Sequence, residues 1–454
     1  METPDVQPAR RQILSVRRIA VVGGGPAGLA AAWHVCGAEA EVTVFEAGPV
    51  AGGLLRTETI GGASVDVGVQ LVSSTHEALF RLARECGAGD LLKRSPGHDA
   101  LWRNGRAHGI TYGSVTSMVA SGALPMTLKL KMGAQYLPFL NRDARSLDAN
   151  DPSATGGVAF DDTSIGEWGR QKLGRDFVEL LAYPLLAAYY GATPEETSAA
   201  VYHALARVGM DVDVYGARGG FGALAAAVVR AIEANGGQVL TERKVTRIEH
   251  RDGDVVIDGD RFDAAILAVP APAASSLLTQ VGGAGEAVKW LGAVRQRPSF
   301  TVVYRLGRGL PGDWFGLSFP RGSGGGGRVA VMCVQSRKLP GLVEQGDAVV
   351  VIPAPGAVAD LLERADDDIA RTLLGDLEHG TPGIGQRVTS SHVFRWPDGY
   401  TLFPPGHLQH IRAFPATSLP ANIALAGDYL VAPSVEGAVR SGTRAARRVL
   451  SDPA

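Results

Sequence analysis

The residues with the clearest chemical meaning are three glycines spaced as G-x-G-x-x-G near the start of the chain. Gly23, Gly25 and Gly28 follow the apolar run 18–22 and open an alanine-rich stretch in which Pro26 and Ala27 stand at the start of a predicted helix. In this pattern the first glycine permits a tight turn, the second lets the backbone approach a pyrophosphate, and the third lets the helix pack closely on a strand. The first N–H groups of such a helix favour an anion. The sequence therefore predicts a dinucleotide site at this turn.

An acidic residue completes this pattern. A second apolar run, 41–45, ends at Glu46. The distance from Gly28 to Glu46 is close to the roughly 20 residues expected for an acid that binds the hydroxyls of an adenosine ribose. A carboxylate there also repels a 2′-phosphate, so an NADP-type ligand is not expected.

A second group of chemically informative residues lies near the end of the chain. The apolar run 423–426 leads into Gly427 and Asp428, and 434–449 has helical spacing with small residues on one face. An aspartate beside a helix start can hold ribityl or pyrophosphate oxygens, and the helix dipole can stabilise negative charge on a reduced flavin ring. Taken alone, Gly427-Asp428 could equally just end a strand.

Residue patterns in the middle of the chain predict the elements that surround a nucleotide fold. Gly219-Gly220 matches a second glycine pattern, but no buried strand precedes it, so we predict a turn that opens a helix over 221–235. A strand over 238–249 follows, then two hairpins within 252–259 and a buried strand over 264–269. Because no second dinucleotide site is predicted, we expect no NAD(P)H partner. Electrons would instead leave the bound cofactor for oxygen or a quinone.

Composition excludes several classes of protein. The net charge of −2 lacks the basic excess of a nucleic-acid binder. Three separated cysteines give neither a disulfide framework nor a zinc cage, which favours a reducing, cytoplasmic location. His407 and His410 lack a third ligand nearby in sequence, so no metal site is predicted. No transmembrane segment is expected; 126–140, with Lys129 and Lys131, would suit peripheral contact with a membrane, although a solvated helix is favoured. No oligomeric state is predicted.

Five stretches make the sequence resemble the flavin-containing amine oxidase superfamily, especially its protoporphyrinogen-oxidase-like and carotenoid-desaturase-like branches. The resemblance extends over nearly the whole chain, and the stretches that carry it are 23–28 with Glu46, 52–57, 163–168 with 185–191, 395–408, and 426–442. The resemblance implies FAD as cofactor. The FAD contacts that the residues and the resemblance together predict are Gly23, Gly25, Pro26, Ala27, Gly28, Glu46, Gly53, Arg56, Val245, Gly427, Asp428, Val435, Glu436 and Ala438. Leu54 stands where many relatives have an arginine, which leaves Arg56 to supply the positive charge near the pyrophosphate.

The resemblance and the predicted elements together give an α/β fold with a Rossmann-like FAD-binding domain, a β-meander and an α+β substrate domain built from insertions. The FAD-binding domain is predicted over 15–74, 214–290 and 395–454, and the substrate domain over 75–213 and 291–394. Within the substrate domain we expect helices over 125–140 and 165–190, and antiparallel strands over 299–306, 316–319 and 328–334.

The expected reaction is removal of a hydride from a bulky, largely apolar small molecule, of the protoporphyrinogen or polyene kind. Flavin dehydrogenation demands few side chains, so no obligatory catalytic residue is predicted. Gln70 and Tyr429 are candidates for the flavin edge, and either could instead hold its loop. Lys289 is interpreted as an ordinary helix residue.

Three alternatives stay open from the sequence. The first is a flavin amine oxidase, which the aromatic content of 6% does not favour. The second is a non-redox isomerase or mutase in which reduced FAD takes part; Arg295 and Arg297 would be its candidate diphosphate ligands. The third is an FAD-binding scaffold without activity.

Overall fold

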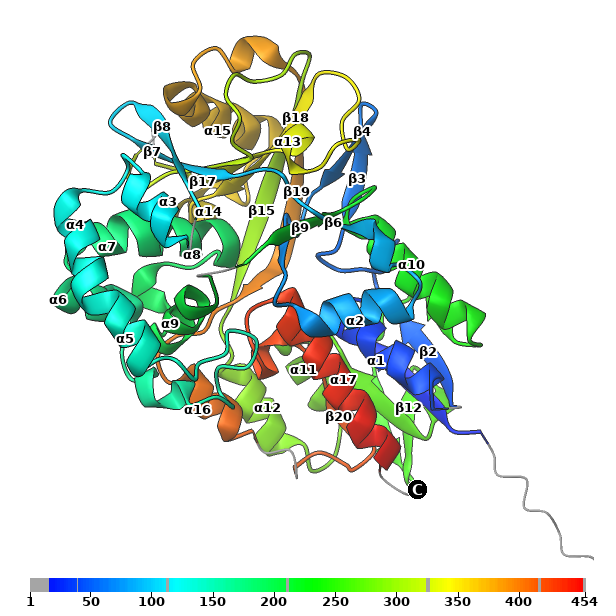
Figure 1. The fold of residues 1–454 in the computed structure, drawn as a ribbon. Coiled ribbons are helices and arrows are strands. Elements are labelled where there is room, and N and C mark those ends of the chain that lie inside the picture. The colour runs from blue at the N-terminus through cyan, green and yellow to red at the C-terminus, as the bar shows by residue number, and fades with distance from the viewer. Residues whose placement is uncertain are drawn as a thin grey trace, which may run out of the picture.

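The computed structural model describes residues 16–38, 40–111, 114–209, 212–323, 327–414 and 418–451. A five-stranded parallel sheet contains the first and the last strand of the described chain (Figure 1). Its strands, in spatial order, are β10 (Gln238–Leu240), β2 (Glu41–Phe45), β1 (Arg18–Val22), β14 (Ala264–Leu267) and β20 (Ile423–Leu425). The predicted dinucleotide fold is therefore confirmed as a Rossmann-like arrangement of parallel strands.

Both faces of this sheet are buried, which explains why its strands are uninterrupted apolar runs in the sequence. Ile19 and Val21 of β1 join one apolar cluster with helices α1 (Pro26–Cys36), α10 (Phe221–Ala234) and α17 (Val435–Ser451). Ala20 and Val22 point the other way, into a cluster with the meander and with α11 (Ala271–Leu278) and α12 (Gly285–Gly292). Lys289 lies on α12, as expected.

The meander consists of β11 (Ile248–Arg251), β12 (Asp254–Ile257) and β13 (Asp260–Phe262), joined by the two predicted hairpin turns. The single predicted strand over 238–249 is wrong: it is broken between Leu240 and Ile248. Glu242 has a φ of +54°, and its N–H and that of Arg243 donate to the carbonyls of Gly48 and Glu46. The backbone there leaves the strand to pack against the end of β2.

A second, seven-stranded mixed sheet forms the other large layer. Its order is β19 (Val388–Thr401), β15 (Gln296–Leu306), β18 (Asp347–Pro353), β17 (Val329–Val334), β16 (Gly316–Ser318), β7 (Asp99–Arg103) and β8 (Arg106–Ile110). The three strands predicted here are confirmed. The predicted domain boundary at 394–395 falls inside β19, which pairs with β15 along most of its length. The division into two domains otherwise stays a proposal.

Small strands connect the two layers. They are β3 (Thr57–Ile60) paired with β4 (Ala63–Asp66), and β5 (Val72–Ser73) paired with β9 (Val214–Ala217), which also pairs with β6 (Leu92–Arg94). Helix α2 (Glu77–Glu85) follows β5 and packs against α17.

A helical layer covers one side of the long strands β15 and β19 (Figure 1). It contains α3 (Val115–Ala120), α4 (Met126–Lys131), α5 (Leu137–Arg142), α6 (Ile165–Lys172), α7 (Arg175–Phe177), α8 (Tyr183–Tyr190) and α9 (Ala199–Val208). A π-turn joins α4 to α5, so the helix predicted over 125–140 is confirmed. The helix predicted over 165–190 is interrupted, because Gly174 has a φ of +98° and ends the run that begins with α6.

The remaining helices are short or lie at the periphery: α13 (Gln335–Lys338), α14 (Val358–Leu361), α15 (Asp366–Gly380) and α16 (His407–Arg412). Within the described ranges, none of the helices combines the length and the apolarity needed to cross a bilayer.

Candidate functional site: a glycine turn, an acid and an apolar cavity

The three glycines of the first turn differ in what surrounds them. Gly23 has a φ of +103°, and a Cβ there would lie 2.3 Å from the carbonyl oxygen of Ala268. A Cβ on Gly28 would lie 1.8 Å from the carbonyl oxygen of Gly23, so the helix can approach the strand only through a glycine. Gly25, in contrast, faces open space, with nothing within 4 Å of where its Cβ would be. A ligand could therefore approach the backbone at Gly25.

The start of α1 offers unpaired donors at this open position. The helix begins at Pro26, and no side chain caps it at Gly25. Its first N–H groups, with the dipole of the helix behind them, therefore favour an anionic group such as a pyrophosphate. The residues present thus fit the predicted dinucleotide.

Glu46 stands at the end of β2, beside the same turn. Its carboxylate accepts hydrogen bonds from the N–H of Gly24 (2.8 Å) and from that of Gly48 (2.7 Å). The N–H of Gly52 donates to the carbonyl of Gly24, and a Cβ on Gly53 would lie 3.2 Å from Cα of Gly25. The structure therefore brings the predicted residues Gly25, Glu46 and Gly53 together around one turn.

Arg56 points away from this turn, toward a set of aromatic rings. Its guanidinium donates to Glu58 (2.6 Å) and lies over the rings of Phe394 and Trp396. Its predicted contact with a pyrophosphate stays a prediction. Val245, in the irregular segment before the meander, is buried beside Phe45 and keeps its backbone at the end of the parallel sheet.

The C-terminal residues close the fold against α1. The Oγ of Ser441 accepts from the N–H of Gly427, and a Cβ on Gly442 would lie 1.9 Å from the carbonyl oxygen of Ala27. Asp428 accepts from the hydroxyl of Thr401 at 2.8 Å, and burial raises its pKa to about 6. Gly427 and Asp428 therefore do more than end a strand, since they link β20, α17 and β19.

Glu436 and Tyr429 are both held by contacts within the protein. The carboxylate of Glu436 is fully buried and accepts from the N–H groups of Ala78 and Leu79, both at 2.9 Å, while pairing with Arg440. Its side chain thus caps α2, and its contact with a cofactor stays a prediction. Tyr429 is 1% exposed, and its ring packs in the core beside Trp290, which favours the interpretation that it holds its loop; its place at the flavin edge stays a prediction. Val435 and Ala438 lie on the first turn of α17 and stay predicted contacts.

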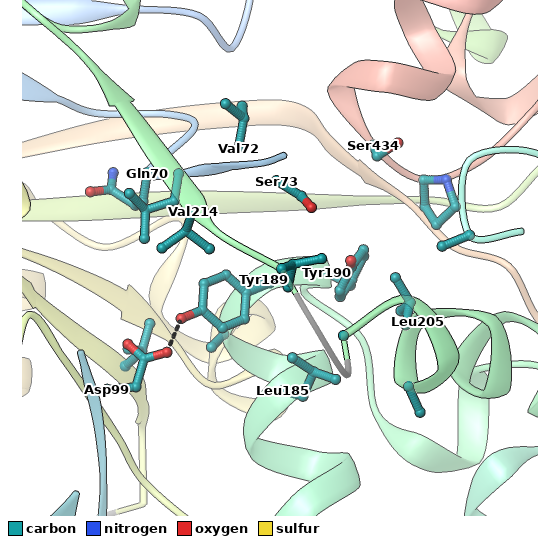
Figure 2. A pocket seen from close by; sticks show the side chains of 18 of the residues that line it. Gln70, Val72, Ser73, Asp99, Leu185, Tyr189, Tyr190, Leu205, Val214 and Ser434 are labelled. Atoms are coloured by element: carbon teal, nitrogen blue, oxygen red, sulfur yellow. Dashed lines mark hydrogen bonds between the residues drawn. The ribbon is translucent and has the colours of Figure 1, made fainter. Parts of the chain in front are cut away.

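A cavity of about 420 Å³ lies between the two layers (Figure 2), a size typical of small-molecule sites. One side is formed by Leu54, the loop Gly68–Gln70 and the segment Pro433–Val435 that precedes α17. The opposite wall comes from the seven-stranded sheet and the helical layer. Seven aromatic residues contribute to the lining: Tyr136, Tyr189, Tyr190, Tyr202, Phe315, Trp396 and Tyr400. The cavity is therefore bordered directly by the segments predicted to hold the flavin.

Gln70 lines this cavity, as expected, but its amide is used in the loop. Nε2 donates to the carbonyls of Asp66 (2.6 Å) and Gly68 (3.2 Å), and Oε1 accepts from Gln335 (2.9 Å). The structure supports the interpretation that Gln70 holds the loop, and its catalytic role stays a prediction.

The main acidic group of the lining is Asp99, at the first position of β7. It accepts a hydrogen bond from the hydroxyl of Tyr189 on α8 at 3.1 Å, as Figure 2 shows. Burial raises its pKa to about 6, and the hydrogen bond from Tyr189 opposes that rise. Asp99 stands in no sequence motif and was not predicted. The available signal was an acidic residue directly before the apolar run 100–102.

Two residues of the lining have a buried side-chain nitrogen without a hydrogen bond within the described chain: Nε1 of Trp396 and Nδ1 of His76. Burial, with the nearby charge of Arg440, lowers the pKa of His76 to about 4, so its imidazole is neutral at physiological pH.

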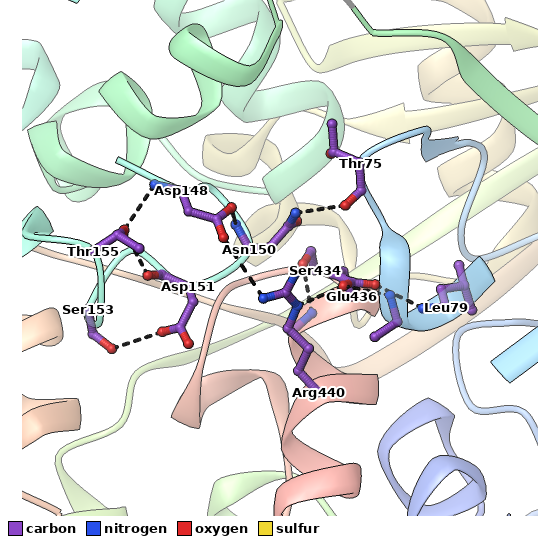
Figure 3. A network of polar contacts seen from close by, with 12 residues as sticks. Thr75, Leu79, Asp148, Asn150, Asp151, Ser153, Thr155, Ser434, Glu436 and Arg440 are labelled. Carbon is purple, nitrogen blue, oxygen red and sulfur yellow. Dashed lines mark hydrogen bonds and ion pairs between the residues drawn. The ribbon is translucent and has the colours of Figure 1, made fainter. Parts of the chain in front are cut away.

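A polar network holds a loop, residues 143–156, over the start of α17 (Figure 3). Asp148 and Asp151 pair with Arg440 and Arg444 on α17, and Nδ2 of Asn150 donates to the carbonyl of Thr75 at 2.8 Å. Asn150 also lines the cavity. This loop therefore forms part of the cavity wall and is fastened to the helix that is predicted to meet the cofactor.

No second dinucleotide site forms at the Gly219-Gly220 turn. The N–H of Phe221 donates to Asp66 (2.7 Å) and that of Gly222 to the hydroxyl of Thr57 (2.7 Å). The start of α10 is thus occupied by the protein's own side chains, as expected for a simple turn.

His407 and His410 do not form a metal site with any other residue of the described chain, which contains no group of three or more potential ligands. His407 is buried, and burial lowers its pKa to about 4. His410 stacks on Trp290 with ring centres 4.3 Å apart.

Comparison with known proteins agrees with this geometry. The chain is 26% identical over 476 residues to coproporphyrinogen III oxidase of Mycobacterium tuberculosis, covering 96% of this chain and 98% of that protein. It is 28% identical over 292 residues to phytoene dehydrogenase of Streptomyces griseus, covering 58% and 56% of the two chains. The crystal structure of a putative protoporphyrinogen oxidase from Exiguobacterium sp. 255-15 has the same fold, with a TM-score of 0.75 at 20% identity and coverage of 96% and 99%. Residues 26–450 match the family described as flavin containing amine oxidoreductase. The chain therefore belongs to the flavin-containing amine oxidoreductase family.

Proposed function

We propose that this protein binds FAD and uses it to oxidise a bulky, largely apolar small molecule by removal of a hydride. The observation that carries the proposal is the apolar cavity, because the loop Gly68–Gln70 and the segment Pro433–Val435 border it directly. The glycine turn and Glu46 lie at the ends of neighbouring strands of the same sheet and would hold the adenosine and pyrophosphate. When bound, the flavin supplies the hydride acceptor.

The side chains of the chain itself would then position the substrate and exclude water. Apolar residues such as Leu185, Leu205 and Val214 line the cavity and offer contacts to an apolar body (Figure 2). The apolar lining would also keep water away from the reacting carbon. Similarity to the coproporphyrinogen III oxidase and to the phytoene dehydrogenase supports a polycyclic or polyene substrate, and oxygen or a quinone remains the proposed electron acceptor.

A second candidate, oxidation of an amine, gains support from the cavity. The overall aromatic content of 6% does not favour an aromatic cage, yet seven aromatic residues gather at this one site. The mutase alternative loses support, because Arg297 donates to the carbonyl of Gly191 and pairs with Glu196. Neither Arg295 nor Arg297 is among the described residues that line the cavity.

The proposal is tested by mixing the FAD-loaded protein with candidate substrates without oxygen. Stoichiometric loss of the oxidised-flavin absorbance supports it; turnover only after prior reduction supports the mutase, and no response to any candidate supports a scaffold. Leu205→Glu would place a charge in the cavity and is expected to slow reduction while FAD stays bound. Leu205→Met keeps the wall apolar and is the matched control.

Peripheral membrane contact is also proposed, from a patch at one margin of the cavity. Val115, Val119, Met126 and Leu130 on α3 and α4 are exposed by 41, 60, 65 and 66%. Val115 also lines the cavity, so the patch adjoins the site itself. A patch of this kind, with Lys129 and Lys131 beside it, matches the composition of a membrane-surface contact.

A further inference from the structure

The cavity has an acidic end whose role the proposed oxidation does not explain. Asp99 begins β7, and its neighbours across the sheet and from the helical layer are Gly316, Cys333 and Tyr189. A Cβ on Gly316 would lie 2.4 Å from Oδ1 of Asp99, so the glycine makes room for the carboxylate. The thiol of Cys333 is buried, and its pKa is raised by burial and by the charge of Asp99. The groups around Asp99 are thus one hydroxyl donor, a glycine, a thiol and the neighbouring His98, whose charge lowers the pKa of Asp99.

No lysine or arginine balances this carboxylate, since none is among the described residues that line the cavity. Burial keeps the lining residue His76 neutral by lowering its pKa to about 4. The charge of His98 acts on Asp99 and opposes the rise in its pKa, and the ring of His98 also faces Asp313 at 3.4 Å. With a pKa of about 6, Asp99 is ionised at pH 7.5 and retains lone pairs that one hydroxyl cannot satisfy.

These observations discriminate between classes of substrate. A buried carboxylate costs free energy unless a donor pairs with it. A pure hydrocarbon would displace water from the cavity and offer the Asp99 carboxylate no hydrogen bond in exchange. A substrate with carboxylates in its buried part would place like charges together, and no lysine or arginine is among the described lining residues to separate them. A molecule with an N–H donor on an apolar body satisfies both the carboxylate and the walls.

We propose that Asp99, oriented by Tyr189, is the recognition point for an N–H donor, and that the substrate carries such a group on an apolar body with no carboxylate in its buried part. This inference rests on the proposed function. The shared chemistry is the N–H donor, which a neutral pyrrole-type ring and a protonated amine both provide. Asp99 is thus a specificity-determining residue for the cavity.

Binding of four matched tricyclic probes to the FAD-loaded protein tests the proposal independently of turnover. The probes are 9-aminofluorene (ammonium), carbazole (neutral N–H), fluorene (hydrocarbon) and fluorene-9-carboxylate (anion). Dissociation constants come from perturbation of the flavin spectrum at pH 7.5. Asp99→Asn is expected to weaken the binding of 9-aminofluorene by about ten- to a hundredfold and the binding of carbazole by less. The reason is that a hydrogen bond to an ionised acceptor is stronger than one to a neutral amide. Fluorene should bind the variant at least as tightly as it binds the wild type.

Either of two outcomes would overturn the inference. One is an unchanged order of probe affinities in Asp99→Asn. The other is a wild-type affinity for fluorene-9-carboxylate equal to that for 9-aminofluorene. Tyr189→Phe should reduce the preference for N–H probes only in part, since it keeps the carboxylate. Asp368→Asn, at an exposed ion pair with Arg371 on α15, is the matched control and should change nothing. Thermal unfolding and FAD content check that each variant folds.

The test separates this inference from the proposed function. If the N–H probes bind as expected but no candidate substrate ever reduces the flavin, the oxidase proposal fails and the recognition site stands. If a substrate reduces the flavin equally fast in the wild type and in Asp99→Asn at limiting concentration, the oxidase proposal stands and the recognition site fails.

Discussion

The ion pair between Lys338 and Asp66 offers the sharpest test of how the two layers are joined. Both side chains are fully buried; Lys338 comes from α13, next to the seven-stranded sheet, and Asp66 ends β4. Asp66 also accepts from the hydroxyl of Thr57 (2.6 Å) and from the N–H of Phe221 (2.7 Å). The ammonium of Lys338 lies 5.1 Å from the ring centre of Phe221. The pair therefore joins the seven-stranded sheet to α10 and to the loop that carries Gln70.

Lys338→Met removes the charge but keeps most of the side-chain volume. Asp66 would retain two hydrogen bonds and lose its only described cationic partner, and removal of one partner from a buried pair costs about 3–5 kcal/mol. Asp66→Asn should cost a similar amount, because it leaves a buried ammonium and weakens two charge-assisted hydrogen bonds. In the double variant neither charge remains, so its loss should fall short of the sum of the single losses by about 1–3 kcal/mol.

Equilibrium urea unfolding of the four proteins measures these free energies. Arg371→Met, which breaks the exposed pair with Asp368, is the control and should leave the unfolding midpoint unchanged. A loss of less than about 1 kcal/mol in Lys338→Met would refute the reasoning. Strict additivity in the double variant would refute it as well, since it would mean that the two charges do not interact.

Three further predictions follow from other parts of the structure. Glu46→Ala should weaken FAD binding to apoprotein by at least about tenfold, because the ribose and the N–H groups of the turn lose an acceptor; equal affinity in a fluorescence titration would contradict this. The folded-state pKa of His407 is about 4, below its usual 6.5, so the unfolded chain binds more protons and stability should fall as the pH drops from about 6.5 to 4. His407→Gln should flatten this part of the stability curve, whereas the exposed His392→Gln should not. Val119→Asp with Leu130→Asp should reduce co-sedimentation with phosphatidylglycerol vesicles while leaving oxidation of a soluble substrate intact, and unchanged sedimentation would count against a membrane contact.

The dinucleotide fold could be predicted because its signals are local. The pattern consists of glycines at fixed spacing after an apolar run and an acid at the end of the next run. Each of these residues is required by contacts within or beside the turn itself, as Gly23, Gly28 and Glu46 show. The break after Leu240 could not be predicted in the same way, since it depends on hydrogen bonds to Glu46 and Gly48 from a distant part of the chain.

The cavity residues are harder to predict for a related reason. Asp99 and Tyr189 meet only because β7 and α8 belong to different layers that pack face to face, and neither residue stands in a motif. Glu436 shows a related difficulty, because it lies in a motif, yet its carboxylate caps α2, whose first residues lie far away in sequence. Side-chain direction at these positions is a property of tertiary packing.

The contact between Gly442 and Ala27 has a consequence for biosynthesis. A ribosome makes the glycine turn early, yet the helix that packs behind it emerges roughly 400 residues later, and closing so long a loop is slow. During translation the nascent parallel sheet lacks β20 and α17 and exposes apolar surface that the finished protein covers. We therefore expect the proposed FAD to bind late, after the arrival of these C-terminal elements.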